Sequence, residues 1–207
     1  MDASKVKGVV FDAFGTLVQL GVKTNPYRSL FRLAAQQGIS GASEMPARAM
    51  VANVGILDLA KELGIEVSPT QSRDLLKELI AETYNACRFP ESLVVIQTLK
   101  ENGFKVGLCS NLAQPYGQCL TTLLPEFEFR ALSYELGLMK PMPEIYSAVC
   151  AGLNLDPSEI LFVGDSKSCD YLGPVMAGMQ ALHLQRGQNG NSVATLREVL
   201  GLLKIVL

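Results

Sequence analysis

The sequence predicts an α/β fold: a doubly wound, mostly parallel sheet with helices on both faces and an inserted helical unit. Short apolar runs alternate with helical segments from residue 104 onward, which is typical of strands joined by crossover helices. Residues 18–88 show helical spacing and no convincing strand. With 207 residues, 48% of them hydrophobic, the chain is large enough for one main core and a smaller unit.

The first predicted strand is the apolar run at residues 9–11, which ends at Asp12. Four helices are expected in the inserted unit, at residues 27–37, 45–54, 56–63 and 69–87. Ser68 precedes the last of them as its expected N-cap. A further helix at residues 92–102, ended by Gly103, returns the chain to the core.

The rest of the chain alternates between strands and helices. The strands are expected at residues 104–109, 127–133, 160–163 and 181–184. The helices are expected at residues 114–124, 144–152, 171–179 and 192–203. This pattern predicts a core formed by residues 1–17 and 89–207, with the inserted helical unit at residues 18–88.

The composition argues against several classes of partner. The formal net charge is −2 and no basic stripe is interleaved with aromatic residues, so nucleic acid is not expected. No apolar run is long enough to span a bilayer and no signal peptide is recognised, so we expect a cytoplasmic protein without a membrane partner. The five cysteines lack C-x-x-C spacing, which favours reduced thiols over a disulfide or zinc framework.

Polar side chains follow the predicted strands at the points where the strands end. They are Asp12, Ser110, Asn111, Lys140, Asp165 and Asp170. The carboxyl ends of parallel strands gather at one edge of an open sheet, and ligands bind at that edge. The sequence therefore predicts one crevice that contains carboxylates, a hydroxyl and an ammonium group.

Four segments carry these residues in order along the chain. Residues 9–17 read Val-Val-Phe-Asp-Ala-Phe-Gly-Thr-Leu, and residues 108–111 read Leu-Cys-Ser-Asn. Residues 137–146 read Gly-Leu-Met-Lys-Pro-Met-Pro-Glu-Ile-Tyr, and residues 161–178 contain Gly-Asp-Ser, then Asp170, and end in Ala-Gly. Together they resemble the four ordered motifs of the haloacid dehalogenase superfamily, over essentially the whole chain. The resemblance implies a Rossmann-like core with a C1-type helical cap inserted after the first motif.

The resemblance also implies roles for the residues that match the motifs. Asp12 would attack an electrophilic phosphorus or carbon and become esterified, and water would then release the product. Ser110 and Asn111 would bind the substrate, with Ser110 hydrogen-bonded to the transferring group. Lys140 would supply positive charge between that group and Asp12. This charge offsets the repulsion that arises when an anion approaches a carboxylate.

A magnesium ion is the implied cofactor. By resemblance its ligands would be Asp12, the backbone carbonyl of Phe14, Asp165 and Asp170. Oxygen ligands of this kind suit Mg²⁺, which completes its octahedral shell with water and substrate. The expected partner is a small phosphorylated metabolite, and the chain is expected to be a monomer or a homodimer.

Phe14 departs from the pattern of most phosphatases in this family, which carry a second Asp at this position. That carboxyl protonates the leaving alkoxide and later activates water. General acid–base help of this kind is worth about 10²–10⁴-fold. The proton chemistry at this site is therefore expected to be weakened.

Three functions remain open. The first is a Mg²⁺-dependent phosphatase that forms an aspartyl-phosphate on Asp12 and works best on good leaving groups. The second is a 2-haloacid dehalogenase, whose relatives carry an aromatic residue at the position of Phe14 but Ser at that of Asp165. The third is a non-catalytic relative that binds a phosphorylated ligand or a partner protein. A phosphonate hydrolase also lacks the second Asp, but Lys61 does not fit its pattern.

The predicted cap offers few polar side chains that could face the crevice. They are Asn25, Tyr27, Arg28 and Arg48. Either arginine could bind a second anionic group of a substrate. Exposed arginines on solvated helix faces are the simpler interpretation, so the cap does not identify the substrate.

Overall fold

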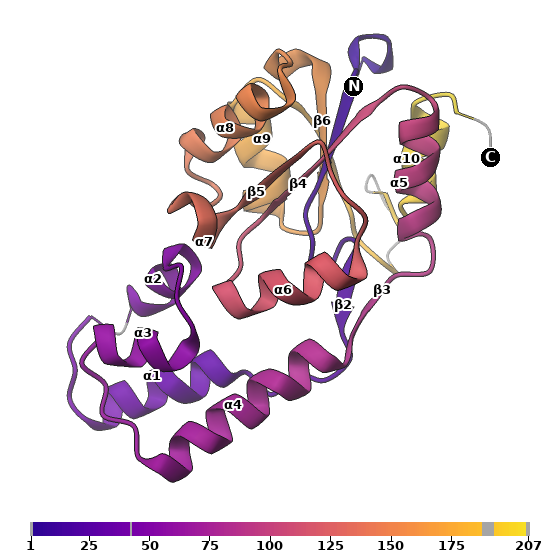
Figure 1. Cartoon of the computed structure of the whole chain (residues 1–207). Helices are drawn as coiled ribbons and strands as arrows, with labels where there is room; N and C mark the ends of the chain where they lie inside the picture. Colours follow the sequence, from indigo (N-terminus) through magenta and orange to yellow (C-terminus); the bar gives the residue numbers. More distant parts are fainter. Residues whose placement is uncertain (1, 42, 188–192, 206–207) are drawn as a thin grey trace.

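The computed structural model describes residues 2–41, 43–187 and 193–205. Its main sheet has five strands in the order β5-β4-β1-β6-β7, and every neighbouring pair is parallel. The strands are β1 (Gly8–Phe11), β4 (Lys105–Ser110), β5 (Phe129–Leu132), β6 (Ile160–Gly164) and β7 (Gln180–His183). Helices cover both faces of this sheet (Figure 1). The predicted α/β fold is therefore confirmed.

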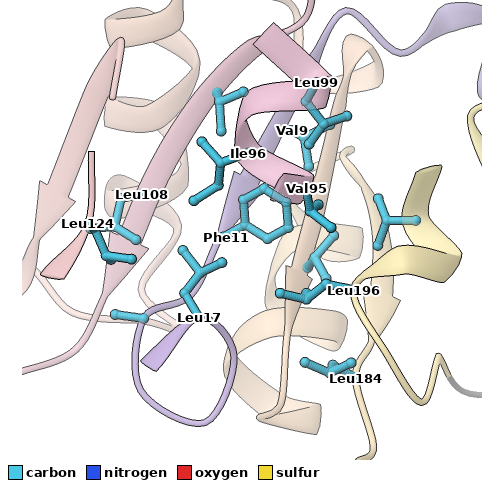
Figure 2. Close-up of a cluster of buried hydrophobic side chains, with 14 of the residues drawn as sticks. Val9, Phe11, Leu17, Val95, Ile96, Leu99, Leu108, Leu124, Leu184 and Leu196 are labelled. Carbon is cyan, nitrogen blue, oxygen red and sulfur yellow. The ribbon is translucent and has the colours of Figure 1, made fainter. Parts of the chain in front are cut away.

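β1 lies at the centre of the sheet and all four of its residues are buried. Val9 and Phe11 point to the face that is covered by α5 (Ser92–Glu101), α6 (Gln114–Leu123) and α10 (Arg197–Leu202), and Figure 2 shows part of this core. Val10 points to the opposite face, where α8 (Pro143–Leu153) packs. A strand with both faces covered reads as a continuous apolar run, which is why residues 9–11 could be recognised.

Four helices form an inserted unit, the helical insertion (residues 26–84), beside the sheet (Figure 1). They are α1 (Pro26–Gln36), α2 (Met45–Val51), α3 (Ile56–Glu62) and α4 (Pro69–Tyr84). Their apolar faces bury a core of their own. Ser68 caps α4 in a capping box with Gln71, as its sequence position predicts. No helix in the described ranges is both long and apolar enough to cross a membrane.

A short antiparallel ribbon joins the helical insertion to the core. It pairs β2 (Val18–Leu20) with β3 (Ala86–Arg88). The expectation of no strand between residues 18 and 88 was therefore wrong, and so was the extension of the last helix to residue 87. A three-residue strand contains too few positions to show alternation. The helix ends where the side chain of Asn85 donates a hydrogen bond to the carbonyl of Ala81.

Several other boundaries differ from the prediction. α7 (Ser133–Leu136) follows β5 directly, and 3₁₀ turns occur at Ala3–Lys5 and Pro157–Glu159. The helix expected at residues 171–179 is a wide π-type turn (Lys167–Leu172) followed by α9 (Gly173–Met176). The closing helix begins at Arg197, and the predicted start at residue 192 lies outside the described residues.

Candidate active site

The carboxyl ends of the central strands bring four polar side chains together. Asp12 follows β1, Ser110 ends β4, Lys140 follows α7, and Asp170 lies in the turn after β6. All four are buried, with Asp12 at 6% exposed and Lys140 at 2%. The Ser110 hydroxyl donates to Asp12 Oδ1 at 3.0 Å. The predicted convergence at one sheet edge is therefore present in the structure.

Lys140 lies between two carboxylates. Its Nζ is 2.8 Å from Asp12 Oδ1 and 2.6 Å from Asp170 Oδ1, and it also donates to the Cys109 carbonyl at 2.8 Å. Burial opposes the positive charge, but Asp12 and Asp170 together raise the pKa of Lys140 above its ordinary value. These three bonds use all three ammonium hydrogens. Lys140 therefore balances the charge of the two carboxylates in this arrangement.

The two oxygens of Asp12 have different surroundings. Oδ1 accepts the hydrogen bonds from Ser110 and Lys140. Within the part of the chain that the structure describes, no hydrogen bond reaches Oδ2. The backbone N–H of Asp12 donates to the Val163 carbonyl at 3.0 Å, which anchors the residue to β6. Oδ2 is therefore the Asp12 oxygen that remains open to a metal ion or a substrate.

Asn111 positions Lys140. Its Nδ2 donates to the Lys140 carbonyl and its Oδ1 accepts from the Lys140 backbone N–H, both at 2.8 Å. This pair of bonds fixes the backbone from which the buried ammonium extends. The predicted role of Asn111 in substrate binding stays a prediction, because both polar atoms of its side chain already contact Lys140.

Three carboxylates could hold a metal ion. Asp12, Asp165 and Asp170 each place one oxygen within 4.8 Å of the others. Partial desolvation and the charge of Asp12 raise the pKa of Asp165, although the residue is exposed. A compact set of hard oxygen donors fits Mg²⁺. Nothing in the structure tests the Phe14 carbonyl as a ligand, so this role stays a prediction.

Asp170 is fixed by its own loop. Its Oδ2 accepts the backbone N–H of Ser166 at 2.9 Å, and Tyr146 donates to the neighbouring Cys169 carbonyl at 2.6 Å. Burial raises the pKa of Asp170 to about 6, while the Lys140 ammonium opposes that rise. Tyr146 is itself buried and bonded, so its contact supports the Asp170 loop.

Arg186 is a positioning residue that the sequence analysis missed. Its guanidinium donates to the Thr16 carbonyl at 2.7 Å and to Glu91 Oε1 at 2.7 Å. The guanidinium carbon, Cζ, lies 3.5 Å from the centroid of the Phe89 ring. These contacts tie the loop after Asp12 to the start of α5. Arg186 lies beyond the last strand and outside every recognised motif, so no sequence signal indicated it.

Gly15 carries the loop after Asp12 directly past Asp165. Its φ is +90°, and a Cβ at this position would lie 2.0 Å from Asp165 Oδ2. Gly15→Ala is therefore expected to displace the Asp165 carboxylate and to weaken Mg²⁺ affinity at least about tenfold, or 1.4 kcal/mol. Calorimetric titration with Mg²⁺ would measure this change.

Gly38→Ala is the matched control for this prediction. Gly38 also has a positive φ, +72°, but no atom of the described residues lies within 4 Å of the place that a Cβ would take. Both variants carry similar left-handed backbone strain, of about 1–2 kcal/mol. Equal Mg²⁺ affinities in the two variants would contradict the placement of Asp165 as a ligand.

A cavity of about 580 Å³ lies between the core and the helical insertion. Phe14 and Asn111 form part of its wall, so it adjoins the loops that follow Asp12 and Ser110. Asn25, Tyr27 and Arg28 also line this cavity, whereas Arg48 is exposed and is not among the lining residues. The cavity is thus bordered by both the helical insertion and the loop after Asp12.

The chain is similar to known proteins over nearly its full length. A family model described as haloacid dehalogenase-like hydrolase matches residues 6–178. A phosphoglycolate phosphatase of Mannheimia succiniciproducens is 30% identical, covering 91% of this chain and 89% of the relative. Another, of Yersinia pestis, is 28% identical, covering 92% and 86%.

Solved structures share the fold. A haloacid dehalogenase family enzyme from Bacteroides thetaiotaomicron, in complex with magnesium and inorganic phosphate, has a TM-score of 0.65 at 19% identity, covering 90% of this chain and 98% of that one. A 2-haloacid dehalogenase from Pseudomonas syringae has a TM-score of 0.66 at 19% identity, covering 96% and 98%. The family-model match spans well over half of the sequence, and the chain therefore belongs to the haloacid dehalogenase-like hydrolase family.

Proposed function

We propose that this hydrolase is a Mg²⁺-dependent phosphatase that acts on the phosphate monoester of a small molecule through an aspartyl-phosphate on Asp12. The cluster of Asp12, Asp165 and Asp170 around one point carries this proposal. The two full-length relatives, both phosphoglycolate phosphatases, support the same class of reaction. We further propose that residues 18–88 act as a cap over the site, because the helical insertion borders the cavity beside Phe14.

The first step forms an ester between the enzyme and the phosphoryl group. The Asp12 carboxylate attacks phosphorus while the bond from phosphorus to the leaving oxygen breaks, and the electron pair departs with that oxygen. Ser110 and Lys140 hold Oδ1, which fixes the plane of the carboxylate during the attack. In the second step a water oxygen attacks phosphorus, the bond from phosphorus to the Asp12 oxygen breaks, Asp12 leaves as the carboxylate, and the proton of the water passes to solvent.

Charge balance makes the approach of a phosphate dianion feasible. Lys140 neutralises part of the negative charge of Asp12 and Asp170 from a buried position, where electrostatic interactions are stronger than in water. Asp12, Asp165 and Asp170 would hold Mg²⁺, which supplies additional positive charge next to the transferring group when bound. Asn111 and Arg186 keep the two loops of the site in place.

The proposal is tested by hydrolysis of p-nitrophenyl phosphate, with Mg²⁺ and with a chelator. Its leaving group scarcely needs a proton, so the assay does not depend on the acid that Phe14 lacks. Release that requires Mg²⁺ is expected. Absence of release from this substrate under both conditions would contradict the proposed phosphatase.

A 2-haloacid dehalogenase is the second candidate, and Phe14 is the observation that favours it. Halide departs without a proton, and an aromatic residue at this position resembles that branch of the family. The carboxylate of Asp165 weighs against it, since it completes a metal cluster that dehalogenation does not need. Chloride release from 2-chloropropionate in chelator would support this candidate over the phosphatase.

Phe14→Asp is expected to restore acid catalysis. Turnover of an alkyl phosphate should rise by up to about 10²-fold relative to turnover of an aryl phosphate, because the poorer leaving group gains more from a proton. Phe14→Asn is the control, since it has nearly the same shape and no acidic proton. Equal kcat values for the alkyl phosphate in the two variants would show that the missing acid is not what limits the reaction.

A further inference from the structure

The cavity beside Phe14 has an aromatic wall, formed by Phe14, Tyr116, Tyr27 and Phe31. The ring of Phe14 meets that of Tyr116 edge to face, with centroids 5.8 Å apart. The ring centroid of Tyr27 lies 6.3 Å from that of Tyr116 and 6.3 Å from that of Phe31. The aromatic wall therefore runs without a break from the nucleophile loop into the helical insertion.

Most of the remaining lining is also apolar, with side chains such as Leu20, Met50 and Leu112. The volume of about 580 Å³ falls within the range of small-molecule sites, about 300–1,000 Å³. The hydroxyl of Tyr27 is buried, and no hydrogen bond from the described residues reaches it. The cavity is thus suited to a flat, largely apolar group rather than to a small and strongly hydrated one.

The buried charge in this cavity is negative. Glu82 is 3% exposed and accepts hydrogen bonds from the Tyr116 hydroxyl and from the Asn25 backbone N–H, the latter at 2.7 Å. Lys23 and Arg28 also border the cavity, but both are exposed and solvent screens their charge. A leaving group that carries a carboxylate would lie near the Glu82 carboxylate and be repelled by it.

The identity of Phe14 restricts the leaving group in a second and independent way. With no carboxyl at this position, residue 14 cannot protonate the departing oxygen, which favours a leaving group that is stable as an anion. A phenol, with a pKa of about 10 like that of tyrosine, tolerates this far better than an aliphatic alcohol does. The chemistry at Phe14 and the shape of the cavity therefore select the same kind of leaving group.

We infer that the substrate is an aryl phosphate, a phosphate ester of a small uncharged phenol whose ring packs against Phe14, Tyr116 and Tyr27. This inference rests on the proposed phosphatase function. In the first step the bond between phosphorus and the phenolic oxygen breaks, the phenolate departs with the electron pair, and solvent protonates it. The Asp12 carboxylate forms the new bond to phosphorus.

The first test compares substrates on the unaltered protein. Phenyl phosphate is paired with hexafluoroisopropyl phosphate, whose leaving alcohol is about as acidic as phenol but has no ring. A preference of about tenfold or more in kcat/KM for phenyl phosphate is expected from ring packing and apolar burial. Phosphoglycolate, whose leaving group carries a carboxylate, is expected to be a poorer substrate than either.

The second test assigns the preference to the aromatic wall. Tyr27→Ala is expected to reduce the phenyl-to-hexafluoroisopropyl ratio to within about twofold of one, because it removes a ring from the aromatic wall. Tyr27→Phe keeps the ring and should retain most of the preference. Tyr84→Ala, at a side chain that is 85% exposed on α4, is the surface control and should match the parent ratio.

Acetyl phosphate separates the two levels of the argument, because its leaving group needs neither a proton nor a ring. Mg²⁺-dependent hydrolysis of acetyl phosphate would support the phosphatase. If kcat/KM is then equal for phenyl and hexafluoroisopropyl phosphate, or highest for phosphoglycolate, the substrate inference is overturned while the phosphatase proposal is retained. No Mg²⁺-dependent hydrolysis of any of the four phosphates would overturn both. The substrate comparison requires no variant, so it decides the question even if Tyr27→Ala does not fold.

Discussion

Asp12→Asn is expected to lower turnover of p-nitrophenyl phosphate by at least about 10³-fold, because loss of a covalent nucleophile leaves only the binding and electrostatic contributions of the site. The amide keeps an oxygen that can accept hydrogen bonds from Ser110 and Lys140, so the fold should be retained. Steady-state kinetics at saturating Mg²⁺, with a circular dichroism spectrum of each protein, would measure both effects.

Asp58→Asn is the matched control for this experiment. It makes the same chemical change at an exposed residue in the first turn of α3. Its turnover should equal that of the parent within about twofold, since surface substitutions rarely shift stability by more than about 0.5 kcal/mol. Turnover of Asp12→Asn within tenfold of the parent would mean that Asp12 is not the nucleophile.

Among the proposed substitutions, Lys140→Met is expected to lower the free energy of unfolding most. It replaces a buried ammonium with an apolar chain of similar length and leaves Asp12 and Asp170 buried without their shared counter-charge. Breaking a buried ion pair from one side costs about 3–5 kcal/mol. Urea unfolding at neutral pH would measure the change, and Lys61→Met on the exposed surface of α3 should leave stability nearly unaltered.

The effect of Lys140→Met should depend on pH in a defined direction. Burial raises the folded-state pKa of Asp170 above that of the unfolded chain, and without the Lys140 ammonium this rise is no longer opposed. The folded variant then holds its protons more tightly, so stability falls as pH rises above about 4, the pKa of an unfolded carboxyl, and the loss shrinks below it. Adding Asp170→Asn should recover part of the loss at neutral pH. No recovery would show that the two carboxylates are not what Lys140 neutralises.

The main architecture follows from local patterns in the sequence. Apolar runs ended by Asp12, Ser110 and Asp165 identify buried parallel strands, and parallel strands carry the residues at their ends to one edge. That rule was sufficient to bring together Asp12, Ser110, Asp165 and Asp170. It was also sufficient to place Lys140 among them, because the loop after β5 ends at the same edge.

The contacts between the core and the helical insertion could not be predicted in the same way. Glu82 and Tyr116 meet across the junction of α4 and α6, and nothing in either helix alone indicates the other as a partner. The orientation of two packed units depends on many weak side-chain contacts rather than on a local pattern. Arg186 illustrates the same limit, since its partners Thr16 and Glu91 come from distant segments of the chain.

The roles of single atoms were equally hidden. The amide of Asn111 is bonded to the backbone of Lys140, a contact that its position after the strand did not indicate. The three hydrogens of the Lys140 ammonium are all directed to protein oxygens, and the motif did not indicate which ones. Sequence position specifies which side chains reach the crevice, but the hydrogen-bond partners depend on geometry at the scale of one ångström.

The covalent step is tested most directly by mass spectrometry of the protein quenched in acid during turnover of p-nitrophenyl phosphate with Mg²⁺. The account predicts one phosphoryl group on the peptide that contains Asp12, absent in Asp12→Asn and absent when the chelator replaces Mg²⁺. Rapid Mg²⁺-dependent turnover with the phosphoryl group on a different residue would contradict it.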